Sequence, residues 1–215
     1  MIPAVAGRGI FVAGGRPPPG KLVALLAREA WSLRRLGPRV AVFYLRLLWT
    51  AARARDEWTL ASAARPRELA PLLEAARGLG TVVEMGTGTA WSAAALALAD
   101  SRRVIFTYDP IVRHERDLYL GLLRPDARSR IHLLGDPDAD NAKAPDAIDL
   151  LFIDSSHERD ETIATFESWK GRVRSGGYVT FHDYGNPRFP GVTAAVDQLA
   201  LQGRSYGYTF VWRKP

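Results

Sequence analysis

Apolar residues follow a helical period in the first third of the chain. Across residues 21–36 they recur every three or four positions between arginines, which predicts a helix with one apolar face. Gly37 and Pro38 interrupt this pattern, and a second helical run covers residues 40–52. A shorter helix is predicted near residues 67–77, because two glycines follow it and glycine commonly ends a helix.

The period then changes to short β-rich runs that alternate with helical stretches. The predicted strands are residues 81–85, 104–108, 130–134, 149–153, 178–181 and 208–212. Strands separated by helices favour parallel pairing, because each crossover needs a helix to cover the sheet. We therefore predict an α/β fold with a Rossmann-like, doubly wound, mostly parallel sheet, helices on both faces and an N-terminal helical extension. The chain ends soon after Trp212, so a final antiparallel hairpin is expected to be short.

Three segments are predicted from this pattern. Residues 1–20 are rich in Gly and Pro and are expected to form a flexible arm. Residues 21–60 form the helical extension, and residues 61–215 form a single cofactor-binding domain. The amphipathic, Arg-bearing extension could be a lid over the site, a contact in a homodimer, or a helix pair lying on an anionic membrane.

Composition narrows the chemistry only in part. The chain has no cysteine, so any metal must be bound by Asp, Glu or His. The net charge of +6 comes mainly from scattered arginines, and we expect no nucleic-acid partner. Prolines and arginines interrupt the first twenty residues, and the later apolar run of thirteen is too short to span a bilayer. We expect a cytoplasmic protein without stable membrane insertion.

A glycine turn joins the first predicted strand to the next helix. Gly86 and Gly88 flank Thr87, and glycine at this point allows a tight turn and the close approach of a ligand. Dinucleotide-binding proteins share this feature. Glu84, at the end of the apolar strand, favours a ligand with a cationic amino group, because its charge would repel a pyrophosphate.

The residues around this turn sharpen the prediction. Trp91 stands where a dinucleotide fingerprint has its third glycine, and the hydroxyl of Ser92 can bind a carboxylate near the start of the helix. Asp109 ends the second strand, where an acid can bind both hydroxyls of a ribose. Asp136 follows the third strand and is a candidate for contact with an adenine. As alternatives, Asp109 could belong to a simple turn and Asp136 to a helix cap.

Ionisable residues also follow the next two strands. Asp154 comes directly after the strand at residues 149–153 with His157 close behind, and His182 and Asp183 follow the strand at 178–181. Parallel strands end at one edge of the sheet and lie about 5 Å apart, so these side chains can share one cation. Oxygen ligands favour Mg²⁺, and an imidazole ligand would tolerate Mn²⁺. His157 is a candidate base. The structural alternative is that the aspartates cap helices and His157 lies on the surface.

The chain resembles the class I S-adenosylmethionine (SAM) dependent methyltransferases from about residue 61 to its end. The glycine turn with Glu84 and the acid Asp109 match the positions where that family binds the methionyl amino group and the ribose. Residues 149–199 look like one branch, methyltransferase family 24, which includes metal-dependent O-methyltransferases and cephalosporin hydroxylase-like proteins. The resemblance implies that Asp154 and Asp183 bind the metal and that His157 is the base. His182 departs from the pattern, because the branch has an acid there.

The sequence therefore predicts a SAM-dependent methyltransferase that acts on a hydroxyl oxygen of a small-molecule acceptor, with Mg²⁺ or Mn²⁺ assistance. No Asp/Asn-Pro-Pro-Tyr motif follows the fourth strand, which argues against an amino-methyltransferase. A non-catalytic, regulatory SAM-binding protein is one alternative. An NAD-dependent oxidoreductase is another, and Trp91 and Glu84 argue against it.

Overall fold

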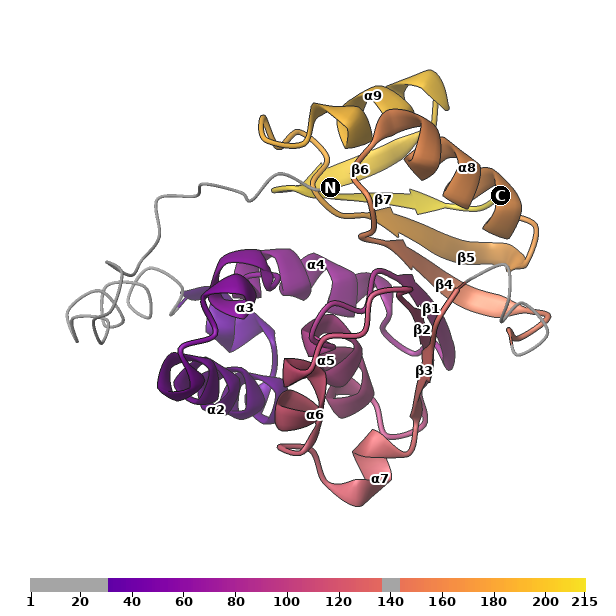
Figure 1. Ribbon diagram of the computed structural model, residues 1–215. Helices are drawn as coiled ribbons and strands as arrows, with labels where there is room; N and C mark the ends of the chain where they lie inside the picture. The colour runs from indigo at the N-terminus through magenta and orange to yellow at the C-terminus, as the bar shows by residue number, and fades with distance from the viewer. Residues whose placement is uncertain (1–30, 137–143) are drawn as a thin grey trace.

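The computed structural model describes residues 31–136 and 144–215 (Figure 1). The predicted arm and the first part of the first predicted helix lie outside the described residues. The described helices, after a helical stretch at residues 31–35, are α2 (Pro38–Ala54), α3 (Glu57–Ser62), α4 (Pro66–Ala75), α5 (Trp91–Ala99), α6 (Glu115–Leu120), α7 (Pro125–Arg128), α8 (Arg159–Trp169) and α9 (Pro190–Gln198).

Seven strands form one sheet in the order β3-β2-β1-β4-β5-β7-β6. They are β1 (Thr81–Met85), β2 (Val104–Tyr108), β3 (Ile131–Leu134), β4 (Ile148–Ile153), β5 (Val173–Phe181), β6 (Gly203–Tyr206) and β7 (Thr209–Arg213). The first five pair in parallel, and β7 pairs antiparallel to both β5 and β6. This arrangement confirms the predicted mixed, mostly parallel sheet. The final hairpin is complete, with strands of four and five residues.

Both faces of the sheet are covered, and the strand residues alternate between two cores. In β1, Val82 belongs to the core under α2, α4 and α5, while Val83 and Met85 belong to the core under α8 and α9. Figure 1 shows these two helical layers on opposite sides of the sheet. Strands buried on both faces read as continuous apolar runs, which is why β1 and β4 could be found in the sequence.

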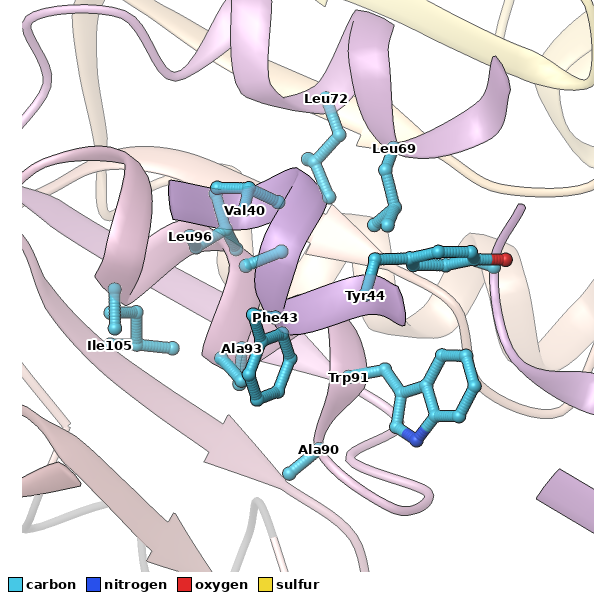
Figure 2. Close-up of a cluster of buried hydrophobic side chains, with 14 of the residues drawn as sticks. Val40, Phe43, Tyr44, Leu69, Leu72, Ala90, Trp91, Ala93, Leu96 and Ile105 are labelled. Carbon is cyan, nitrogen blue, oxygen red and sulfur yellow. The ribbon is translucent and has the colours of Figure 1, made fainter. Parts of the chain in front are cut away.

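The helical extension packs into the same core as the rest of the domain. Val40, Phe43 and Tyr44 of α2 are buried against the alanine-rich α5 and the leucines of α4 (Figure 2). Small side chains on α5 let the two helices approach closely. The short helix α3, which the sequence pattern did not predict, begins at Asp56, whose side chain accepts a hydrogen bond of 2.9 Å from the Thr59 amide.

Candidate active site

The predicted site residues gather at one edge of the sheet because four neighbouring strands end there. In register, Met85 of β1 lies beside Tyr108 of β2 and Ile153 of β4, and Ile153 lies beside Phe181 of β5. Asp109, Asp154 and His182 come directly after these positions. In open α/β sheets this carboxyl edge is where ligands bind.

The glycine turn packs directly against the end of β4. Gly86 has φ of +99°, and a Cβ atom there would collide with the backbone oxygen of Asp154. Only glycine fits, because both the backbone angle and the space exclude a side chain. Gly88 has φ of +51° and lies under the ring of Trp58 from α3, over which the Arg113 guanidinium stacks at 3.3 Å.

Glu84 is fully buried at the floor of this turn. One carboxylate oxygen accepts a hydrogen bond from the Ser92 hydroxyl, and the other accepts one of 2.5 Å from Thr107. The Thr87 hydroxyl, 2.7 Å from that of Thr107, extends the chain of hydroxyls. Burial raises the pKa of Glu84 to about 7, although the two hydroxyl donors act in the opposite direction. A cationic ligand would stabilise the charged form of this buried carboxylate.

Asp109 holds the glycine turn from the second strand. Its carboxylate accepts hydrogen bonds from the amides of Gly88 at 2.8 Å and Ile111 at 2.9 Å. The buried guanidinium of Arg116 donates to the Gly88 carbonyl at 3.1 Å and lies 3.5 Å from the carboxylate of Asp109. Arg116 was not predicted from the sequence, since its partners lie 28 and seven residues away and no local motif marks it.

One predicted cofactor contact, that of Trp91, needs correction. The side chain of Trp91 is buried between the rings of Tyr44 and Tyr119, at centroid distances of 5.5 and 5.8 Å, so it belongs to the core (Figure 2). The phase of α5 turns the ring toward Tyr44 of α2. Asp136 is exposed after β3.

Four ionisable side chains meet where β4 and β5 end. Asp154, His157, His182 and Asp183 each offer one ligand atom, and these atoms all lie within 4.8 Å of one another. The Nδ1 atom of His182 lies 3.0 Å from Asp154 Oδ1 and 3.2 Å from Asp183 Oδ2. The Nε2 atom of His157 lies 3.3 and 3.1 Å from the same two oxygens. The predicted convergence of these residues is therefore present.

The backbone around this cluster is unusual. His157 and Asp183 both have positive φ, 63° and 62°, a region that costs side-chain-bearing residues about 1 kcal/mol or more. The His157 ring stacks on Phe189 at 4.3 Å, and Gly191 lies so close to the His157 carbonyl that a Cβ atom would not fit. Asn186 donates a 2.5 Å hydrogen bond to Asp183. These contacts hold the side chains in a strained arrangement, which is common at functional sites.

Opposite charges set the electrostatics of the cluster. Burial alone would raise the pKa of Asp154, but the two imidazoles outweigh it and lower that pKa to about 2. The pKa of Asp183 is lowered too, by the same imidazoles acting against burial. Burial would lower the pKa of His157, yet the two carboxylates raise it to about 9, and they raise the pKa of His182 as well.

The cluster also fits a divalent cation. Two ligands at right angles around an ion about 2.1 Å away lie about 3.0 Å apart, and tetrahedral ligands lie about 3.4 Å apart. The four separations between imidazole nitrogen and carboxylate oxygen, 3.0 to 3.3 Å, fall in this range. Direct hydrogen bonds between imidazolium and carboxylate have similar lengths, so the geometry is compatible with both states.

A third carboxylate approaches the cluster from the helical layer. Glu68 of α4 is nearly buried, and its Oε2 lies 3.6 Å from the Nε2 atom of His182, on the side of the ring that faces away from Asp154. The same oxygen accepts a 2.7 Å hydrogen bond from the amide of Arg65, which fixes its position. Glu68 was not predicted from the sequence. Its hydrogen bond with the Arg65 amide also caps the start of α4.

Comparisons with known proteins agree with this geometry. A family model described as a methyltransferase domain matches residues 83–184, which include the glycine turn and the whole cluster. An uncharacterized protein of Acanthamoeba polyphaga mimivirus is 39% identical over 66 residues, a match that spans 30% of this chain and 30% of that protein.

Several solved structures with a similar fold are O-methyltransferases by their descriptions. An O-methyltransferase from Bacillus cereus, solved with S-adenosylhomocysteine (SAH), has a TM-score of 0.64 at 18% identity, covering 90% of this chain and 100% of that one. The O-methyltransferase TomG from Streptomyces achromogenes, solved with SAM, has a TM-score of 0.57 at 17% identity, covering 79% and 89%. CalS11, a TDP-rhamnose 3'-O-methyltransferase, has a TM-score of 0.56 at 16% identity, covering 94% and 96%.

Proposed function

We propose that this chain is a class I SAM-dependent methyltransferase that transfers the methyl group of SAM to a hydroxyl oxygen of a small molecule with the assistance of a divalent cation. One observation carries the proposal. The glycine turn, where the donor is expected, touches the backbone of Asp154, whose side chain belongs to the ionisable cluster. A methyl donor and an activated hydroxyl would therefore be neighbours at one edge of the sheet.

The donor seat is assigned to the β1 and β2 side of this edge. Glu84 would receive the methionyl ammonium. Ser92 and Thr87 would bind nearby, because the Ser92 hydroxyl donates to this carboxylate and the Thr87 hydroxyl reaches it through Thr107. Asp109 would take the ribose hydroxyls. Its two oxygens already accept amide hydrogens at the mouth of the turn. The exposed Asp136 remains the candidate neighbour of the adenine.

The cation is assigned to Asp154, His182 and Asp183, and His157, the fourth member of the cluster, keeps the role of base. One imidazole beside two carboxylates suits Mn²⁺ or another transition ion better than Mg²⁺, which prefers oxygen ligands. A bound cation would supply Lewis acidity that lowers the pKa of an acceptor hydroxyl. We include Mg²⁺ in the test, because two ligands are carboxylates and water can complete its shell.

The proposed reaction balances with groups of this chain. The acceptor oxygen forms a bond to the methyl carbon while the carbon-sulfur bond breaks, and the bonding electrons stay on sulfur to give SAH. The hydroxyl proton would go to the neutral form of His157, which a neighbouring cation favours over the imidazolium form. His157 is the more accessible imidazole of the two, with 23% of its side chain exposed against 9% for His182. The Phe189 ring stacked on His157 holds the imidazole in this position.

Calorimetry separates the parts of this proposal. We expect SAM and SAH to bind the chain and NAD not to bind. We expect Mn²⁺ to bind with a stoichiometry of one, and binding to disappear in Asp154→Asn. Binding of NAD without SAM or SAH would overturn the assignment. If SAM binds but neither Mn²⁺ nor Mg²⁺ does, the assignment of the donor seat stands and the metal is removed from the proposal.

A further inference from the structure

The outer face of α2 carries apolar side chains that the domain does not cover. While Val40 and Phe43 pack inward, Val42, Leu45 and Trp49 point away from the core, with exposed fractions of 57%, 42% and 60%. Their spacing of three and four places them on one stripe of the helix. Single exposed apolar residues are ordinary, but a continuous stripe marks an interaction surface.

The same stripe carries three of the six arginines that account for the net charge of the molecule. Arg39, Arg46 and Arg53 lie on it, at helical spacing from Val42 and Trp49. Residues 31–55 contain six arginines and neither Lys, Asp nor Glu, while the rest of the chain holds 23 basic and 23 acidic residues. The formal charge of +6 is therefore that of this one segment, although the arginines of the whole chain look scattered.

A shallow apolar groove of about 420 Å³ runs beside this stripe. Val42 and Phe43 of α2 line it together with Leu122 and Leu123 from the segment after α6. Three arginines, Arg39, Arg46 and Arg124, stand among its lining residues, and no acid does. An apolar floor between guanidinium groups matches the chemistry of a lipid, whose acyl chains lie beneath an anionic headgroup.

We propose that this face of α2 binds peripherally to the surface of an anionic phospholipid bilayer. The helix would lie flat, with Trp49, Leu45 and Val42 entering the boundary between headgroups and acyl chains and the arginines contacting lipid phosphates. Among the described residues, no helix is long and apolar enough to cross a bilayer.

A second copy of the chain fits this face less well. In a two-fold symmetric interface the same patch lies on both partners, so each set of arginines would face another. Residues 31–55 offer no carboxylate to compensate. Anionic lipid supplies the missing opposite charge. The proposal concerns the side of α2 that faces away from α5 and does not depend on the function proposed above.

Co-sedimentation of the full chain with vesicles tests this proposal. We expect binding to vesicles of phosphatidylcholine with about 30% phosphatidylserine, much weaker binding to phosphatidylcholine alone, and release at high salt. The double variant Arg39→Gln/Arg53→Gln should bind at least about tenfold more weakly, at roughly 1 kcal/mol for each arginine near the surface. Trp49→Ser should weaken binding to both kinds of vesicle.

Matched controls distinguish this face from general charge or instability. Arg77→Gln/Arg102→Gln removes the same charge from exposed positions elsewhere and should leave binding unchanged. SAH binding and circular dichroism should stay normal in all variants, because the replaced side chains are exposed. Failure of the unaltered chain to bind anionic vesicles would overturn the proposal. So would a concentration-dependent dimer, measured by light scattering, that Trp49→Ser dissociates.

Discussion

The two halves of the site edge are built in different ways. At the ends of β1 and β2, the proposed donor seat consists of a backbone turn and one carboxyl group, that of Glu84. Burial raises the pKa of this group to about 7, and two hydroxyl groups donate hydrogen bonds to it. At the ends of β4 and β5, four ionisable groups of opposite charge crowd together in a strained backbone. The first half can recognise the shape of a ligand and one ammonium group. The second half can bind a cation and accept a proton. Changes in one half should therefore leave binding at the other intact.

We expect Asp154→Asn to show the largest difference between the two halves of the site. This variant keeps the shape of the side chain but removes a charge that both imidazoles contact. We expect turnover to fall by about a thousandfold, in line with several kcal/mol from a metal ion, and cation binding to be lost. Affinity for SAH should stay within about twofold, measured by calorimetry. Unchanged turnover in Asp154→Asn would show that the cluster does not serve the chemistry.

Gly86→Ala should damage the contact between the two halves. Its Cβ atom would collide with the Asp154 backbone, whereas a Cβ atom at Gly78, which has a similar positive φ of 74°, would meet no atom within 4 Å. Gly78→Ala is the matched control for the backbone angle alone and should cost about 1 kcal/mol of unfolding free energy. We expect Gly86→Ala to cost about 3 kcal/mol or more in urea unfolding. Equal losses for the two variants would rule out the collision.

The raised pKa of Glu84 should make the affinity for SAM depend on pH. With its pKa raised to about 7 by burial, the carboxyl group is protonated below that pH and cannot pair with an ammonium group. Affinity for SAM should therefore fall as the pH drops from about 8 to about 6, approaching tenfold per unit below the pKa. Glu84→Gln should bind SAM about tenfold more weakly at about pH 8 and lose this pH dependence. A flat profile for the unaltered protein would contradict the assigned role.

The smallest effect is expected from Glu68→Gln. If Glu68 orients His182 by facing its Nε2 atom, the variant should weaken cation binding by about tenfold without affecting SAH. Glu74→Gln, an exposed acid on the same helix, is the control. Unaltered cation affinity in Glu68→Gln would limit this residue to capping α4.

Residues that directly follow a strand could be predicted from the sequence, because the strand fixes where they emerge. Asp154, His182 and Asp183 are of this kind, and so is Asp109. Glu68 and Arg116 could not be predicted, since their partners lie far away in the sequence and depend on how helices pack on the sheet. Trp91 shows the limit of a motif, because its position says nothing about which way the ring turns.

Nuclear magnetic resonance of SAM in the presence of Mn²⁺ tests most directly that donor and cation sit side by side. Paramagnetic Mn²⁺ bound at the cluster should strongly broaden the S-methyl resonance of SAM in exchange with the protein, and Asp154→Asn should abolish the broadening while SAM still binds. A sharp S-methyl signal with SAM and Mn²⁺ both shown to be bound would contradict the proposed site.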